Sequence, residues 1–352
     1  MSNVPTILVK TQLNMENIAA ARISEILPNV KVVPKPFGFN GIVVVYSDDP
    51  FSDAEKIRDN VVEAERVIPA YKVVDSNLDS IVNAAKEIVV DKISSEETFA
   101  VRTVRRGKQS YTSIDVNVKV GAVVKEVTGA DVNLDFPDKI VVVEIVGNYT
   151  LISMIPGSEE YKKMRPDKAP ILHYLHKIAL IQMPYLGPLN AAYNMGGRIG
   201  RAIQNFELKE LVIAPIGLTP ADQLAKFIEG VYEGINSRYE IQRKIYARKV
   251  YPTKVFVEDL YQVVRDRFDE PIIIFEPEGD VVAKVKDRII KIFNEKSNKR
   301  INIFVGSRSG IPVGLYRYAD LVLDIAPEIT LSTDIAASSA IIALITVLEE
   351  NI

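Results

Sequence analysis

The sequence predicts an α/β protein whose second half forms a mostly parallel sheet, preceded by two smaller α+β units. Apolar strand-length runs alternate with helical segments through that second half, which is typical of a parallel sheet covered by helices. A polar, proline-bounded segment at 156–170 separates it from the first half. With 352 residues, of which 47% are hydrophobic, the chain is long enough for several packed cores.

The first unit is expected at residues 1–62. Its strand and helix patterns alternate at 6–9, 15–26, 31–33, 42–46 and 53–64. Such alternation within a short stretch predicts a ferredoxin-like α+β domain.

The second unit, expected at residues 63–155, contains a basic segment at 99–113 with four cations and no acid. These cations are Arg102, Arg105, Arg106 and Lys108, on a predicted strand and the turn after it. They are candidates for binding phosphates, although such a run taken alone is more typical of a solvated strand edge. Residues 114–120 then alternate apolar and polar side chains, which taken alone predicts another strand.

The third unit is expected at residues 171–352, after a linker at 156–170. Its predicted strands lie at 178–183, 211–216, 254–257, 272–275, 301–305 and 321–325, with helices between them. This βα pattern predicts a mostly parallel sheet with helices on both faces.

Three loops of the third unit are candidates for a binding site, because they follow strands or precede a helix. One begins at Gly306, a second at Ala326, and a third ends in helix-capping residues before a helix rich in Ala and Ser. Such loops expose backbone N–H and C=O groups beside a helix start that a ligand can approach closely. We therefore expect a pocket for a nucleotide-like ligand.

These loops resemble the last motifs of the SpoU-type enzymes in the SPOUT superfamily of RNA methyltransferases. The matching stretches are Gly306-Ser307-Arg308-Ser309-Gly310, Ala319-Asp320-Leu321-Val322, Ile325-Ala326-Pro327 and Ser332-Thr333-Asp334-Ile335-Ala336. Two residues depart from the family pattern, since Arg308 replaces a glutamate and Asp334 replaces an asparagine. The resemblance implies a trefoil-knotted parallel-sheet domain that binds S-adenosylmethionine.

The resemblance also implies which residues bind this cofactor, largely through backbone groups. They are Val305, Gly306, Ser307, Ile325, Pro327, Leu331, Ser332, Asp334 and Ala336.

Residues 194–202 are similar to the first SpoU motif, in which an arginine after Asn-x-Gly closes on the reacting ribose and phosphate. The spacing is one residue longer here than in that motif. Arg201 matches when the motif is counted back from the next strand, and Arg198 remains an alternative. The resemblance implies that Arg201 and Asn194 are catalytic.

The second unit resembles the THUMP domain, an RNA-binding module that accompanies ferredoxin-like domains and binds the 3′ end of tRNA. The resemblance rests on Val120-Gly121, Gly129 and the stretch 131–137 before a strand at 140–146. It implies an RNA-binding role for Arg102, Arg105, Arg106 and Lys108. It also places a helix, capped by Ser113, where local alternation predicts a strand, and we follow the helix. The implied inner face of that helix is Ile114, Val118, Gly121 and Val124.

Together these resemblances identify the chain as a member of the archaeal-type THUMP-domain tRNA methyltransferases with a SPOUT domain. The implied reaction is S-adenosylmethionine-dependent 2′-O-methylation of a ribose in or near the tRNA acceptor stem, with the THUMP domain anchoring the CCA end. A homodimer through the SPOUT domain is also implied. The alternatives are methylation of a base, and a non-catalytic RNA-binding protein with a degenerate SPOUT domain.

Composition excludes several other classes. Net charge is only −3, so a nucleic-acid surface must be a local patch. The absence of cysteine excludes thiolate metal sites and cysteine nucleophiles, including that of a 4-thiouridine synthetase. His173 and His176 lack accompanying ligands, so no metal site is expected. Without a signal-like N-terminus or an apolar run of about 18 residues, we expect a cytoplasmic protein that does not bind membranes.

Overall fold

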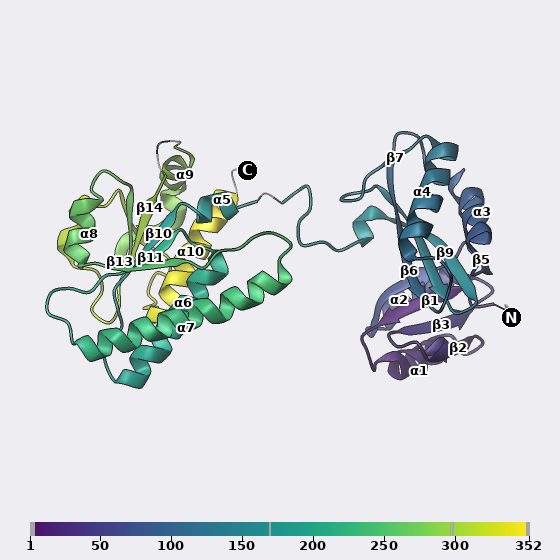
Figure 1. Cartoon of the computed structure of the whole chain (residues 1–352), viewed down its shortest axis with the longest axis horizontal. Coiled ribbons are helices and arrows are strands. Elements are labelled where there is room, and N and C mark those ends of the chain that lie inside the picture. Colours follow the sequence, from purple (N-terminus) through teal and green to yellow (C-terminus); the bar gives the residue numbers. More distant parts are fainter. Residues whose placement is uncertain (1–3, 169, 296, 298, 350–352) are drawn as a thin grey trace. The chain divides into compact units, whose positions relative to one another are not determined.

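The computed structural model describes residues 4–168, 170–295, 297 and 299–349. The chain divides into two compact units, Met1–Pro166 and Asp167–Ile352 (Figure 1). We describe each unit by itself.

The first sheet of the N-terminal unit is antiparallel, in the order β2-β3-β1-β4. Its elements are β1 (Ile7–Thr11), α1 (Glu16–Ile26), β2 (Lys31–Pro34), β3 (Ile42–Tyr46), α2 (Pro50–Asn60) and β4 (Ala64–Pro69). This βαββαβ order is that of the predicted ferredoxin-like domain. Strand β4, which completes the sheet, lies beyond residue 62.

The second sheet of this unit has the order β5-β9-β8-β6-β7. Its elements are β5 (Lys72–Asp75), α3 (Leu78–Val89), β6 (Thr98–Arg106), α4 (Ser113–Thr128), β7 (Asp131–Val132), β8 (Lys139–Val146) and β9 (Tyr149–Pro156). Helices α3 and α4 bury an apolar stripe against one face of this sheet. On its other face, Val142 and Leu151 share a core with Leu8 and Val44 of the first sheet, so the two sheets pack together.

Helix α4 resolves the conflict between two sequence signals. The local alternation predicted a strand at 114–120, which is wrong, and the helix is confirmed. Thr112 caps it instead of Ser113, in a reciprocal capping box with Asp115. The buried stripe is Val116, Val120 and Val124, whereas Ile114 and Val118 are exposed. Of the inner face predicted for this helix, only Val124 is buried.

The C-terminal unit has a six-stranded sheet in the order β12-β11-β10-β14-β13-β15, with every pairing parallel. Its strands are β10 (Ile178–Gln182), β11 (Glu210–Ile213), β12 (Lys254–Val257), β13 (Ile272–Val281), β14 (Ile301–Val305) and β15 (Leu321–Asp324). Each coincides with a predicted strand, with β13 longer than expected.

Helices cover both faces of this sheet, as the βα pattern predicted. The helices are α5 (Leu172–Leu175), α6 (Leu189–Phe206), α7 (Ala221–Ile245), α8 (Leu260–Asp266), α9 (Lys286–Asn294) and α10 (Thr333–Glu349). Helices α6, α7, α9 and α10 bury apolar side chains on one face, and α8 does so on the other. The predicted α/β fold class is therefore confirmed, while the knotted threading of the chain stays a prediction.

Candidate active site

A cavity of about 180 Å³ lies at the carboxyl edge of the C-terminal sheet, beside the ends of β14 and β15. The pairing of β13 with β15 is interrupted between Phe275 and Asp280, and the cavity lies at this interruption. Its other walls are the turn at 306–310, the loop at 325–331 and the first turn of α10. Ligands of open parallel sheets bind at this edge, so the location matches the pocket expected from the sequence.

The turn at 306–310 directly follows the buried strand β14. Its Ser307 hydroxyl is buried and has no hydrogen-bond partner among the described residues. Ser307 lines the cavity, and a buried polar group without a partner is costly unless a ligand or water satisfies it. The turn therefore provides one polar group for which a cavity ligand is a natural partner.

The loop before α10 is held by short-range hydrogen bonds. The Asp324 carboxylate accepts from the Ala326 N–H at 2.9 Å, and the Ser332 hydroxyl donates to Asp334 at 2.7 Å. Asp334 also forms an ion pair with Arg198 of α6 at 2.9 Å. The hydrogen bond from Ser332, followed by that from Arg198, holds the pKa of Asp334 below its usual value.

The structure brings most of the predicted cofactor residues together. Val305, Gly306, Ser307, Ile325, Leu331 and Ala336 line the cavity. Pro327 instead lines a neighbouring cavity of about 430 Å³, while Ser332 and Asp334 lie in the adjoining helix start without lining either. Sequence reasoning missed Glu276, which lines the main cavity from β13. Its place in the sequence could have indicated this role, because Glu276 directly follows the apolar run 272–275 and so lies at the same sheet edge as Gly306.

The two candidate arginines of α6 point to different partners. Arg198 pairs with Asp334 in the first turn of α10, beside cavity-lining Thr333 and Ala336. Arg201 donates to the Ser237 hydroxyl of α7 at 3.1 Å. Asn194 is exposed on α6 and is not among the residues that line the cavity. Of the two arginines, the structure therefore places Arg198 beside the cavity rim.

Two of the three glycines in the stretch 194–202 pack α6 closely against α7. A Cβ atom on Gly196 would lie 2.1 Å from the Phe227 carbonyl oxygen, and one on Gly200 would lie 2.2 Å from that of Val231. Gly230 and Gly234 of α7 make the reciprocal approach to α6. Because contacts this short exclude any side chain, helix packing accounts for these glycines.

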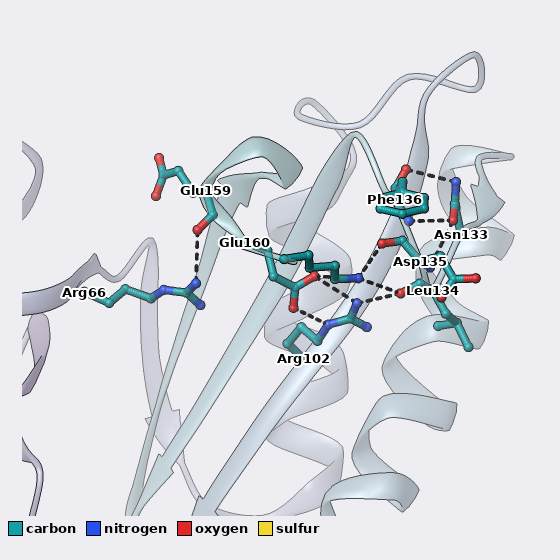
Figure 2. Close-up of polar contacts among 9 residues, drawn as sticks. Arg66, Arg102, Asn133, Leu134, Asp135, Phe136, Glu159 and Glu160 are labelled. Carbon is teal, nitrogen blue, oxygen red and sulfur yellow. Dashed lines mark hydrogen bonds and ion pairs between the residues drawn. The ribbon is translucent and has the colours of Figure 1, made fainter. Parts of the chain in front are cut away.

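Two cations of the basic segment in the N-terminal unit are paired with acids. Figure 2 shows Arg102 between Glu160 and the loop at 133–136. Its guanidinium donates to both carboxylate oxygens of Glu160 at 2.8 and 3.1 Å, and to the Leu134 carbonyl at 2.7 Å. Arg106 donates to the fully buried Glu144 at 2.7 Å. Both guanidinium groups therefore have structural partners.

The other two predicted RNA-binding cations lie at the exposed end of β6. Arg105 donates hydrogen bonds to the carbonyls of Gly107 and Gln109, and among the described residues neither Arg105 nor Lys108 forms an ion pair. Arg105 and Lys108 are consequently the members of the segment whose charge is not offset by an adjacent carboxylate.

The described residues contain no group of three His, Asp or Glu side chains placed to hold a metal ion. Within the same part of the chain, no helix combines the length and apolar character needed to cross a membrane.

Family models match both units of the chain, and two known proteins are similar to it in sequence. A family model of AF2226-like SPOUT RNA methylases fused to THUMP matches residues 172–352, and a THUMP-domain model matches residues 75–154. The uncharacterized protein MJ0421 of Methanocaldococcus jannaschii is 42% identical over 339 residues, which cover 96% of this chain and 92% of that protein. The tRNA (guanine(10)-N2)-dimethyltransferase of the same organism is 26% identical over 161 residues, covering 40% of this chain and 46% of that protein.

Solved structures show only low similarity to the whole chain. PH1313 from Pyrococcus horikoshii has a TM-score of 0.38 and 16% identity, covering 85% of this chain and 93% of that chain. The putative methyltransferase Lpg2936 from Legionella pneumophila, solved with S-adenosylmethionine, has a TM-score of 0.36 and 14% identity, covering 70% and 96%. The family assignment therefore rests on the family models and the sequence relative. On that evidence, this protein belongs to the family of SPOUT RNA methylases fused to a THUMP domain.

Proposed function

We propose that this protein transfers a methyl group from S-adenosylmethionine to tRNA, and that the acceptor is a ribose 2′-hydroxyl in or near the acceptor stem. The observation that carries the proposal is the cavity at the edge of the SPOUT sheet. It combines turns rich in backbone groups with the buried, unpartnered hydroxyl of Ser307. A nucleoside with several hydrogen-bonding groups suits such a site.

The residues of the cavity fit S-adenosylmethionine as the methyl donor. Gly306, Ala326 and Ala336 keep the walls thin, so that a flat ring and a ribose can approach the backbone. Val305, Ile325 and Leu331 supply apolar surface beside them. When bound, S-adenosylmethionine supplies an activated methyl group, and the protein's task is to hold the acceptor in line with it.

Arg198 is the side chain that we propose acts on the acceptor. Only its Nη1 atom contacts Asp334, so this single ion pair holds Arg198 beside the first turn of α10 while its other N–H donors stay available for a phosphate. A guanidinium keeps its charge at neutral pH and binds phosphate oxygens in a fixed geometry. Arg198 would bind the phosphate next to the reacting ribose and stabilise the partial negative charge that the 2′-oxygen gains as its proton leaves for solvent. That oxygen would then take the methyl group, and the demethylated donor would leave as a neutral thioether. Arg201, in contrast, donates to Ser237 of α7, and neither of these residues lines the cavity.

The THUMP unit would position the tRNA, and we propose that it anchors the CCA end. Arg105 and Lys108 supply cations for the phosphate backbone, since no adjacent carboxylate offsets their charge. We also propose that the protein forms a homodimer through its SPOUT unit, which light scattering on the purified protein tests directly.

A base is the second candidate for the acceptor. The relative that is 26% identical over 161 residues is named as a guanine N2 dimethyltransferase. A base nitrogen would need the same donor and the same phosphate contact, but a different orientation of the nucleotide. A non-catalytic RNA-binding protein is the remaining alternative.

The decisive experiment incubates the purified protein with methyl-labelled S-adenosylmethionine and unmodified bulk tRNA, followed by nucleoside analysis. A labelled 2′-O-methylnucleoside supports the proposal. A labelled base would retain the enzyme and replace the acceptor. tRNA binding without any labelled product would favour the non-catalytic alternative.

A further inference from the structure

The Glu276 carboxylate lies in the wall of the cavity, and neither sequence motif includes it. Phe275 pairs with Val305 at the ends of the buried parts of β13 and β14, so Glu276 lies level with Gly306. The parallel pairing therefore places the carboxylate, at the end of the buried part of β13, beside the turn that follows β14.

One oxygen of this carboxylate holds the turn at 306–310. Oε1 accepts a hydrogen bond from the Ile311 N–H at 2.5 Å. A Cβ atom on Gly306 would lie 2.6 Å from Oε1, and one on Gly310 would lie 3.2 Å from Oε2. The two glycines thus leave the space that the Glu276 carboxylate occupies, and Gly310 also needs its positive φ of 69°.

The turn has no carboxylate of its own. Its middle residue is Arg308, whose guanidinium lies over the Tyr185 ring at 5.5 Å, beyond the end of β10. Glu276 is therefore the acid that supports this turn, and its contact depends on β13 rather than on the motif itself.

The second oxygen, Oε2, forms no hydrogen bond with a described residue. Glu276 is half-buried, and this burial raises the pKa of its carboxyl, with a further contribution from the nearby charge of Glu278. A partly desolvated carboxylate with one unpaired oxygen is unfavourable by itself and binds a hydrogen-bond donor strongly. Oε2 is not among the buried atoms that lack a partner, so solvent reaches it, and because the residue lines the cavity a ligand there would replace that solvent as the donor.

We infer that Glu276 is a ligand-binding residue of the methyl-donor site, whose Oε2 accepts a hydrogen bond from an N–H or O–H group of the bound S-adenosylmethionine while Oε1 holds the turn around it. This inference rests on the proposed function, because it takes S-adenosylmethionine as the ligand. Glu276 thereby couples occupancy of the cavity to the position of the glycine turn.

The test is calorimetric titration of S-adenosylmethionine into the full-length protein and two variants. In Glu276→Gln the amide oxygen can still accept from Ile311, but an NH₂ donor then faces the ligand's donor group. We expect the Kd to rise by about tenfold or more, the usual effect of losing a charge-assisted hydrogen bond, with an unchanged melting temperature.

Glu278→Gln is the matched control, since it removes the same charge two residues away, where the side chain contacts Tyr316. Its Kd should stay within about twofold of the wild-type value.

Two further measurements sharpen the result. Titration with adenosine identifies the donor: a loss of affinity for adenosine places it on the base or ribose, and a loss confined to S-adenosylmethionine places it on the amino-acid part. Should Glu276→Gln fail to fold, Glu276→Ala provides the readout, with weaker binding that added acetate partly restores. Equal affinities of the wild type and the folded Glu276 variant would overturn this inference alone. A wild type that binds no S-adenosylmethionine would overturn the proposed function as well.

Discussion

The basic segment of the THUMP unit and the cavity of the SPOUT unit differ in how their polar groups are satisfied. In the basic segment, Arg102 and Arg106 are matched by carboxylates of the same unit. In the cavity, Ser307 has an unpartnered hydroxyl and Glu276 an unpaired oxygen, among the described residues. Two of the four cations in a conspicuous run of charge thus serve internal structure, while an inconspicuous turn retains polar groups for a ligand.

The comparison shows that a count of charges along the sequence says little about binding. An arginine already held by a bidentate carboxylate must lose that pair before it can bind a phosphate. A buried hydroxyl without a partner has no such competitor. The predictions below test this contrast, from the largest expected effect to the smallest.

The largest effect is expected at the rim of the cavity. Arg198→Ala should lower the rate of methyl transfer by about 100-fold or more, because it removes a cation beside the negative charge that forms on the 2′-oxygen as its proton leaves. The affinity for S-adenosylmethionine should change by less than about threefold, since Arg198 does not line the cavity. Single-turnover assays with calorimetry measure both. Arg201→Ala is the matched control on the same helix, and a larger loss in that variant would contradict our choice of arginine.

The glycines of α6 should affect stability rather than binding. Gly200→Ala should lower the free energy of unfolding by about 2 kcal/mol, because its Cβ would lie 2.2 Å from the Val231 carbonyl oxygen. Gly197→Ala is the control, since its Cβ would meet nothing closer than 3.5 Å, and alanine favours a helix. Urea titrations compare the two variants. Equal stability of both would show that helix packing does not explain the motif glycines.

In the THUMP unit, the unpaired cations should contribute more to RNA binding than Arg102. The double variant Arg105→Ala/Lys108→Ala should bind tRNA about tenfold more weakly and reduce the slope of log K against log salt by about 2. Arg102→Gln should change the affinity by less than about twofold. Filter binding at several salt concentrations measures both. If Arg102→Gln proved the weaker binder, the contrast between paired and unpaired cations would be lost.

The smallest effect concerns pH. Arg102, and then Lys162, hold the pKa of Glu160 below its ordinary value. A lowered pKa in the folded state stabilises the protein above the ordinary Glu pKa, and this contribution disappears as the pH falls through the lowered value. Because the pair is partly solvated, we expect under about 1 kcal/mol. Chemical denaturation at pH 7 and pH 3 should show Glu160→Gln less stable than wild type at pH 7, with a smaller difference at pH 3. Glu159→Gln serves as control, because Arg66 contacts the Glu159 carbonyl rather than its side chain.

The strands and the cavity turns were predictable because their signals are local. Buried strands such as 301–305 are continuous apolar runs, and Gly306 marks the end of one directly. Because the strands pair in parallel, the motif residues that follow these strands lie together at one edge of the sheet.

The pairing of charged side chains was not predictable from local pattern. Arg102 and Glu160 are 58 residues apart in the sequence, and Arg106 and Glu144 are 38 apart. Each contact depends on which strands become neighbours. The same reason explains why Glu276 was missed, since its role follows from the adjacency of β13 and β14. Helix α4 is a case in which one local signal was wrong and another was available. Its apolar alternation is typical of a strand, whereas Thr112 and Asp115 form the capping box of a helix.

The central claim is that the cavity at the carboxyl edge of the SPOUT sheet binds the methyl donor. A crystal structure of the protein with S-adenosylmethionine tests it most directly. We predict the nucleoside between the turn at 306–310 and the start of α10, with the ligand donating a hydrogen bond to Glu276 and the Ser307 hydroxyl forming another with it. Density for the nucleoside at any other place on the protein, with this cavity empty, would contradict the account.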